Sequence, residues 1–167
     1  MEQAEKTIRC LLLPTSAGAF LLPNATVSEI ISYTPPVPID QTPDWLLGQI
    51  SWRGWRLPLL SMSLLTGLGE GASVATAKVA ILKAPGRHPR MPFIGVRIQG
   101  FPRLTNVTLD ELEALDSGHI EGRAVSGWVR VRADEGIVPD LAEIEAMVTR
   151  LGEQDESIAD ETPEQPA

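Results

Sequence analysis

Residues 45–58 read WLLGQISWRGWRLP, and this stretch predicts the local fold more directly than any other part of the chain. Short runs rich in apolar residues lie on both sides of Arg53-Gly54, a dipeptide that suits a tight turn between antiparallel strands. The stretch therefore predicts a β-hairpin with strands at 48–51 and 55–61. It is the strongest hairpin signal in the sequence.

Similar short apolar runs occur on both sides of this hairpin, separated by turns that hold most of the 14 glycines and 14 prolines. Further strands are expected at 7–13, 19–22, 74–83, 93–99 and 124–132. Turns are expected at Pro85-Gly86 and Glu135-Gly136. About seven short strands with few helices favour a mainly β fold of small barrels or a sandwich over an alternating β/α sheet.

Four segments carry helix signals, such as a capping residue, a proline at the first turn or apolar residues at helical spacing. The expected helices are 24–31, 44–47, 108–117 and 139–151. Thr108 and Glu111 have the spacing of a capping box, in which each residue satisfies a free backbone N–H of the other. The last segment is the longest and is expected to form a terminal helix.

The formal net charge of −8 is unevenly distributed along the chain. Residues 53–103 carry eight basic groups and one acidic group, whereas residues 152–167 carry six acidic groups and no basic one. The latter segment has too little apolar surface to offset the entropy of ordering, so it is expected to be an acidic disordered tail. The folded domain is expected to span residues 7–151.

Few residues suit catalysis or metal binding. The single cysteine, Cys10, lies in an apolar run and is expected to be a buried, inert thiol. His88 and His119 are the only histidines, and their spacing matches no metal-ligand motif. We therefore expect no catalytic residue, metal or cofactor. Because no apolar run approaches the roughly 18 residues that span a bilayer, we expect a cytoplasmic protein without direct membrane insertion.

The segment Ser51-Trp52-Arg53-Gly54-Trp55-Arg56 is chemically unusual. Tryptophan and arginine are the residue types most enriched at binding hot spots between proteins. The same types also stack on single-stranded nucleic acid, so a nucleic-acid-binding β-barrel that uses the basic block 53–103 is an alternative function. A third interpretation is structural, with the tryptophans packed in a barrel and the arginines solvated.

Four elements in this sequence resemble those of the CheW-like family of chemotaxis adaptors. They are Val27-Ser28-Glu29-Ile30, the stretch 45–54 with Pro58 after it, the strand 93–99, and the segment 137–141 before the terminal helix. The second resembles the family's Gly-x-x-Asn-Leu-Arg-Gly…Pro signature, with Ser51-Trp52 in place of Asn-Leu. The resemblance covers about residues 7–151 and is greatest to members that control type IV pili and twitching motility.

The resemblance implies a fold of two intertwined five-stranded SH3-like β-barrels with short helices and a C-terminal helix. It implies a non-catalytic adaptor that couples a chemoreceptor (a methyl-accepting chemotaxis protein) to a CheA-type histidine kinase, without nucleic acid as a partner. One lobe would bind the kinase, and a groove between the lobes would bind the receptor. Glu29 would pair with Arg53. The expected partner-binding residues are Val27, Glu29, Ile30, Ile31, Trp52, Arg53, Gly54 and Trp55.

Overall fold

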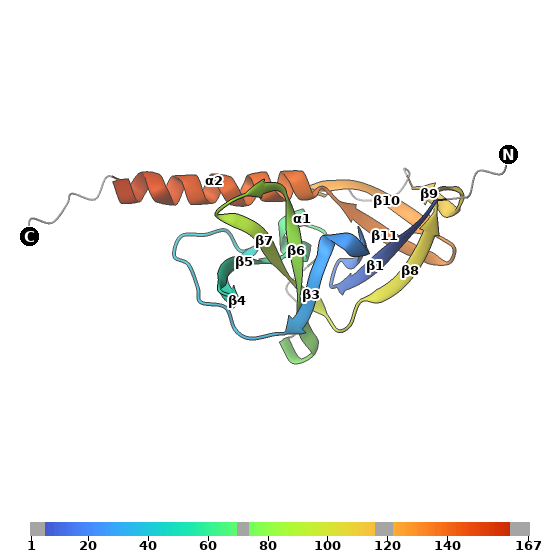
Figure 1. Cartoon of the computed structure of the whole chain (residues 1–167), viewed down its shortest axis with the longest axis horizontal. Helices are drawn as coiled ribbons and strands as arrows, with labels where there is room; N and C mark the ends of the chain where they lie inside the picture. The colour runs from blue at the N-terminus through green and yellow to red at the C-terminus, as the bar shows by residue number, and fades with distance from the viewer. Residues whose placement is uncertain (1–5, 70–73, 116–121, 161–167) are drawn as a thin grey trace, which may run out of the picture.

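The strands of this protein form two sheets in a computed structural model that describes residues 6–69, 74–115 and 122–160. The six-stranded sheet has the order β8-β1-β2-β11-β10-β9, and the five-stranded sheet has the order β3-β6-β7-β5-β4. The chain starts in the first sheet, builds the whole of the second, and then returns to the first (Figure 1). The two lobes are therefore intertwined.

The six-stranded sheet is antiparallel except where β2 meets β11. Its strands are β1 (Thr7–Thr15), β2 (Gly18–Pro23), β8 (Arg103–Thr108), β9 (Leu112–Ala114), β10 (Val125–Val131) and β11 (Asp134–Pro139). Alternate residues of a strand face opposite sides of a sheet. Cys10 and Leu12 thus pack in a core inside this lobe, whereas Leu11 and Leu13 pack in a core that both lobes share.

The five-stranded sheet has a core of its own and also contributes to the shared core. Its strands are β3 (Val27–Ser32), β4 (Leu46–Trp52), β5 (Trp55–Ser61), β6 (Ala77–His88) and β7 (Met91–Gln99). Strand β6 is buried on both faces: Val79 and Ile81 pack inside the lobe, while Ala80 and Leu82 face the shared core. This explains why β6 has a nearly continuous apolar run.

Among the described residues, two α-helices and three short 3-10 turns accompany the sheets. They are α1 (Met62–Thr66), α2 (Leu141–Asp160), and the turns η1 (Asn24–Thr26), η2 (Val74–Thr76) and η3 (Leu109–Glu111). Helix α2 lies along the outside of the five-stranded lobe and places Ile144 and Val148 in the shared core (Figure 1). Glu145 accepts a hydrogen bond of 2.9 Å from the backbone N–H of Gly86, which fixes the helix to β6.

The predicted strands and the hairpin at Arg53-Gly54 are confirmed, but three predicted helices are wrong. Segment 24–31 forms a 3-10 turn followed by β3, because its β-branched residues pair with β6. In segment 44–47, residues 44–45 are a turn, and Leu46 and Leu47 already belong to β4. The capping box at Thr108 and Glu111 is present, but it starts only the 3-10 turn η3, which β9 follows. Residues 116–117 of that predicted helix lie outside the described residues.

Three predicted boundaries also differ from the structure. Pro85-Gly86 and Glu135-Gly136 lie inside β6 and β11, and the chain turns at 89–90 and 132–133 instead. Pairing with β10 outweighs the local turn preference of Glu135-Gly136, whereas Pro85-Gly86 lies where the register of β6 against β7 shifts, between Lys83 and His88. Helix α2 continues to Asp160, beyond the predicted end at residue 151. Glutamate and glutamine are good helix formers, which favours this extension; residues 161–167 lie outside the described part.

Candidate functional site

The carboxylate of Glu29 connects the two edge strands of the five-stranded sheet. Glu29 lies in β3, whereas Trp52 ends β4 at the other end of the strand order. Trp52 Nε1 donates a hydrogen bond of 2.7 Å to Glu29 Oε2, and Arg53 Nε donates one of 3.2 Å to the same oxygen. These side chains therefore close the sheet into a barrel at a place where no backbone ladder joins β3 to β4.

The tight turn between β4 and β5 sets the position of Arg53. Arg53 and Gly54 have φ angles of 47° and 81°, as the two central residues of a type I′ hairpin turn require. The guanidinium of Arg53 lies 5.3 Å from the ring centre of Trp52, within range of a cation–π interaction. Its side chain is still 70% exposed, so the turn presents a charged group that is already oriented.

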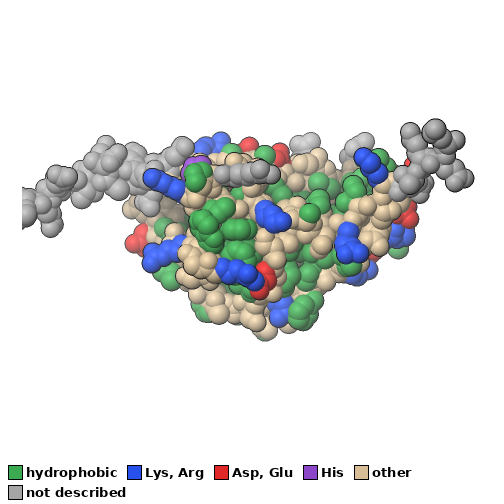
Figure 2. Space-filling view, viewed as in Figure 1, with side chains coloured by type: hydrophobic (Ala, Val, Ile, Leu, Met, Phe, Trp, Pro, Cys, Tyr) green, Lys and Arg blue, Asp and Glu red, His purple; other side chains and the backbone are tan. Residues whose placement is uncertain are grey.

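Aromatic rings extend this cluster along the surface of the lobe. Phe93 of β7 makes edge contacts with both tryptophans, at 4.9 Å from Trp52 and 6.2 Å from Trp55. Trp52 is half-buried, whereas Trp55 is exposed. Figure 2 shows hydrophobic side chains gathered near the centre of one face, with basic side chains around them. Oriented aromatic and arginine side chains of this kind are typical of protein-binding surfaces.

The hydrogen bond from Trp52 is the main reason why the pKa of Glu29 lies below its ordinary value. Partial burial raises this pKa, while the hydrogen bond and the charge of Arg53 lower it further. The net effect favours the ionised carboxylate. At neutral pH the cluster therefore contains a charged acceptor held by an indole and a guanidinium.

We expect the carboxyl group of Glu29 to titrate below the range of an ordinary glutamate. Because the folded state has the lower pKa, its stabilising effect is present above the unfolded pKa and is lost as the pH falls through the folded value. NMR titration of the side-chain carboxyl carbon measures this pKa directly. Trp52→Phe should raise it further toward the ordinary value than Arg53→Gln does, and the opposite order would contradict the dominant role of the indole.

The structure separates the predicted partner-binding residues into two groups. Five of them gather around the hairpin turn: Glu29, Trp52, Arg53, Gly54 and Trp55. Val27 and Ile30 instead pack against the shared core, which both can do because a bulge shifts the register of β3 between Val27 and Glu29. Ile31 faces the other way and, like Trp52, packs against the core inside the five-stranded lobe. Phe93 was predicted only as a strand residue, since its position between two tryptophans is a tertiary feature.

The basic side chains of the block 53–103 make separate contacts in different parts of the molecule. Besides Arg53 at Glu29, Arg103 pairs with Asp134 at 2.6 Å and the ammonium of Lys78 lies 4.4 Å from the ring centre of Phe101. Within the described ranges, no group of three or more His, Cys, Asp or Glu residues is placed to hold a metal ion. Among the helices of these residues, none is long and apolar enough to cross a membrane.

Two intertwined β lobes with a shared core and an exposed, pre-oriented Trp-Arg hairpin define a protein-interaction module. A family model for the CheW-like domain matches residues 9–148, so this chain belongs to the CheW-like domain family. The members of this family are non-catalytic scaffold proteins. Membership therefore supports an adaptor role in chemotaxis for this chain.

The solved structures include a similar fold. The scaffolding protein TtCheW from Thermoanaerobacter tengcongensis matches with a TM-score of 0.68 and 16% sequence identity, over 80% of this chain and 89% of that one. This likeness shows the fold, which consists of two SH3-like β-barrels. No protein in the search of curated sequences matches significantly.

Proposed function

We propose that this chain is a non-catalytic adaptor that couples a chemoreceptor to a CheA-type histidine kinase. The observation that carries this proposal is the Glu29–Trp52–Arg53 cluster on an exposed hairpin of a CheW-like fold. No bond is made or broken in such a role. Binding energy alone holds receptor and kinase in one complex.

The receptor side of the proposal uses the edge of β3 and the hairpin turn. Val27 and Ile30 are half-buried against the shared core and offer apolar surface to a partner helix. Arg53 lies beyond Glu29 and is largely exposed, so it is available to orient that helix through a charged contact. Ile31 and Trp52 support this surface from inside the lobe.

An adaptor also needs a second surface that does not compete with the first. The six-stranded lobe exposes large apolar side chains, among them Ile8, Leu104 and Leu109. Leu109 is 72% exposed in the turn η3, on the opposite lobe from the Arg53 hairpin. We assign the kinase to this lobe.

The sequence of residues 45–54 most resembles CheW-like proteins of systems that control type IV pili, so we place this chain in such a pathway. Complementation of twitching motility would test this assignment.

Arg53→Ala is expected to weaken receptor binding by about tenfold or more, because it removes the oriented charge of the site. The protein should remain folded, since an ion pair this exposed contributes little to stability. Co-sedimentation with clustered receptor signalling domains measures the binding, and circular dichroism checks the fold. Arg103→Ala is the matched control, because Arg103 is also exposed and ion-paired but lies in the other lobe. Normal binding by folded Arg53→Ala protein would remove Arg53 from the site.

The adaptor role itself is tested by co-purification of the tagged chain from its own cells. A CheA-type kinase should be recovered with the wild-type chain. The variant Leu109→Glu, which changes an exposed residue of the six-stranded lobe, should no longer recover the kinase but should still bind the receptor. Consistent absence of a kinase, together with binding to single-stranded DNA or RNA that falls steeply with salt, would instead favour the nucleic-acid alternative.

A further inference from the structure

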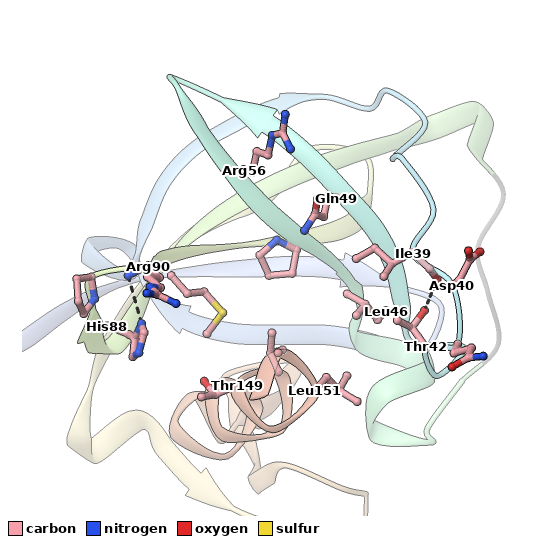
Figure 3. Close-up of a pocket in the computed structure, with 16 residues that line it drawn as sticks. Ile39, Asp40, Thr42, Leu46, Gln49, Arg56, His88, Arg90, Thr149 and Leu151 are labelled. Atoms are coloured by element: carbon pink, nitrogen blue, oxygen red, sulfur yellow. Dashed lines mark hydrogen bonds between the residues drawn. The ribbon is translucent and has the colours of Figure 1, made fainter. Parts of the chain in front are cut away.

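A pocket of about 730 Å³ lies outside the Glu29 cluster, between helix α2 and the β4–β5 hairpin. The crossover segment before β4 and the turn between β6 and β7 form its other two sides. Figure 3 shows Thr149 and Leu151 of α2 on one side, Arg56 of the hairpin opposite, and His88 and Arg90 at one end. This volume is in the range of sites that bind ligands or peptide side chains.

The floor of the pocket is apolar and belongs to the shared core. Leu46 and Val148 are buried members of that core, and the half-buried Ile39, Met91 and Leu151 pack against it. These side chains come from the crossover, two strands and the helix. Gly152 adds no side chain at the mouth, and a Cβ atom there would have no neighbour within 4 Å.

The rim of the pocket is mainly basic. His88 and Arg90 lie at one end and Arg56 lies opposite α2, while Asp40, the only acidic residue among the described lining residues, lies on the far side (Figure 3). Arg56 has no ion-pair partner among the described residues. His88 Nδ1 accepts a hydrogen bond of 3.2 Å from the backbone N–H of Arg90, so a neutral imidazole carries its proton on Nε2. The rim therefore presents hydrogen-bond donors and positive charge.

An apolar floor beside a cationic rim matches one ligand chemistry best. A small anion would use the rim but leave the apolar residues uncovered, whereas a purely apolar segment would leave the guanidinium of Arg56 without an acceptor. We propose that this pocket is a second docking site, for an acidic amphipathic segment of a partner protein. Aliphatic side chains of that segment cover Met91 and Leu151, and its carboxylates face Arg56 and His88.

The position of Arg56 makes this site independent of the adaptor surface proposed above. Arg56 and Pro58 lie on the face of β5 that lines the pocket, whereas Leu57 and Leu59 alternate with them and pack inside the lobe. The Glu29 cluster lies at the opening of that lobe, around Arg53. The two sites therefore share the β4–β5 hairpin but present different faces of it.

The test uses the full chain and a fluorescein-labelled 14-residue peptide with leucine at helical spacing and glutamate elsewhere. A second peptide replaces every glutamate with lysine. We expect only the acidic peptide to bind in a fluorescence anisotropy titration, and to shift the NMR signals of Met91, Leu151 and Arg56. Equal binding of both peptides, shifts confined to other residues, or no binding would overturn the proposal. The same shifts with inorganic phosphate alone would reduce the site to an anion site and overturn the peptide assignment.

Two pairs of variants make the test specific. Arg56→Glu is expected to weaken binding of the acidic peptide about tenfold, whereas Lys83→Glu, an exposed position of β6 that does not line the pocket, should change it less than twofold. Gly152→Leu should narrow the pocket, because Gly152 lines it and the Cβ position there is open, and Gly152→Ala is its control. Thermal unfolding confirms that each variant folds. Wild-type affinity in folded Arg56→Glu and Gly152→Leu proteins would exclude the pocket, and it would leave the receptor and kinase proposal intact.

Discussion

Gly48→Ala is expected to destabilise the protein by about 3 kcal/mol or more, because two separate costs add at this position. Gly48 has a φ angle of 145°, which residues with a side chain rarely adopt. A Cβ atom there would also press on the carbonyl group of Val37, 2.9 Å from its carbon. Val37 cannot retreat easily, since its N–H and C=O both pair with Gln49.

Chemical denaturation and thermal unfolding measure this effect. For a domain of this size, about 3 kcal/mol corresponds to a fall of roughly 6–12 °C in Tm. Gly67→Ala is the matched control, because Gly67 has a φ angle of 75° but open space around its Cβ position. It should show only the backbone cost, about 1 kcal/mol. Equal losses in both variants would mean that the contact with Val37 has no energetic role.

Phe20→Ala is expected to destabilise both lobes together, by about 3–5 kcal/mol. Phe20 lies in β2 of the six-stranded sheet and is 1% exposed. It belongs to the shared core, together with residues of β5, β6, β7 and α2. Because no rearrangement of one lobe alone can fill the cavity, the loss should appear in the unfolding of the whole chain.

Hydrogen exchange with NMR detection distinguishes joint destabilisation of both lobes from destabilisation of the six-stranded lobe alone. Amide groups of β6 in the five-stranded sheet should lose protection by the same free energy as those of β1. Val107→Ala is the control, because Val107 packs only in the core of the six-stranded lobe and removes less volume. If β6 kept its full protection in Phe20→Ala protein, the lobes would be separate folding units and the shared core would not couple them.

The local hairpin and the strands that flank it follow from the sequence alone. Arg53-Gly54 adopts the turn that its position between apolar runs predicts, and the alternation in 124–132 predicts β10. Both are short-range features, since a turn and a period of two depend on neighbouring residues. Gly48 is part of the motif at 45–54, but only the tertiary structure explains why this position requires glycine, because the backbone of Val37 lies against it.

The errors concern segments whose local preference is outweighed by distant partners. Residues 27–31 follow Asn24, which was predicted to cap a helix, but Asn24 makes no side-chain cap, and these residues form β3 because β6 offers a strand to pair with and apolar surface to cover. The capping box at Thr108 and Glu111 forms as predicted, but β10 then pairs with the next residues as β9. A capping signal is local, whereas the length of a helix depends on tertiary contacts.

The sequence by itself determined the mainly β class, the hairpin and the terminal helix, and its resemblance to the CheW-like family implied the Glu29–Arg53 pair. Only the tertiary structure decided which lobe each strand joins, that Trp52 also binds Glu29, and that Phe93 lies between the two tryptophans. It also decided where α2 leaves a basic-rimmed pocket. The physical reason is range: turns and periodicity act over a few residues, whereas the shared core and the closure of the barrel join residues far apart in the chain.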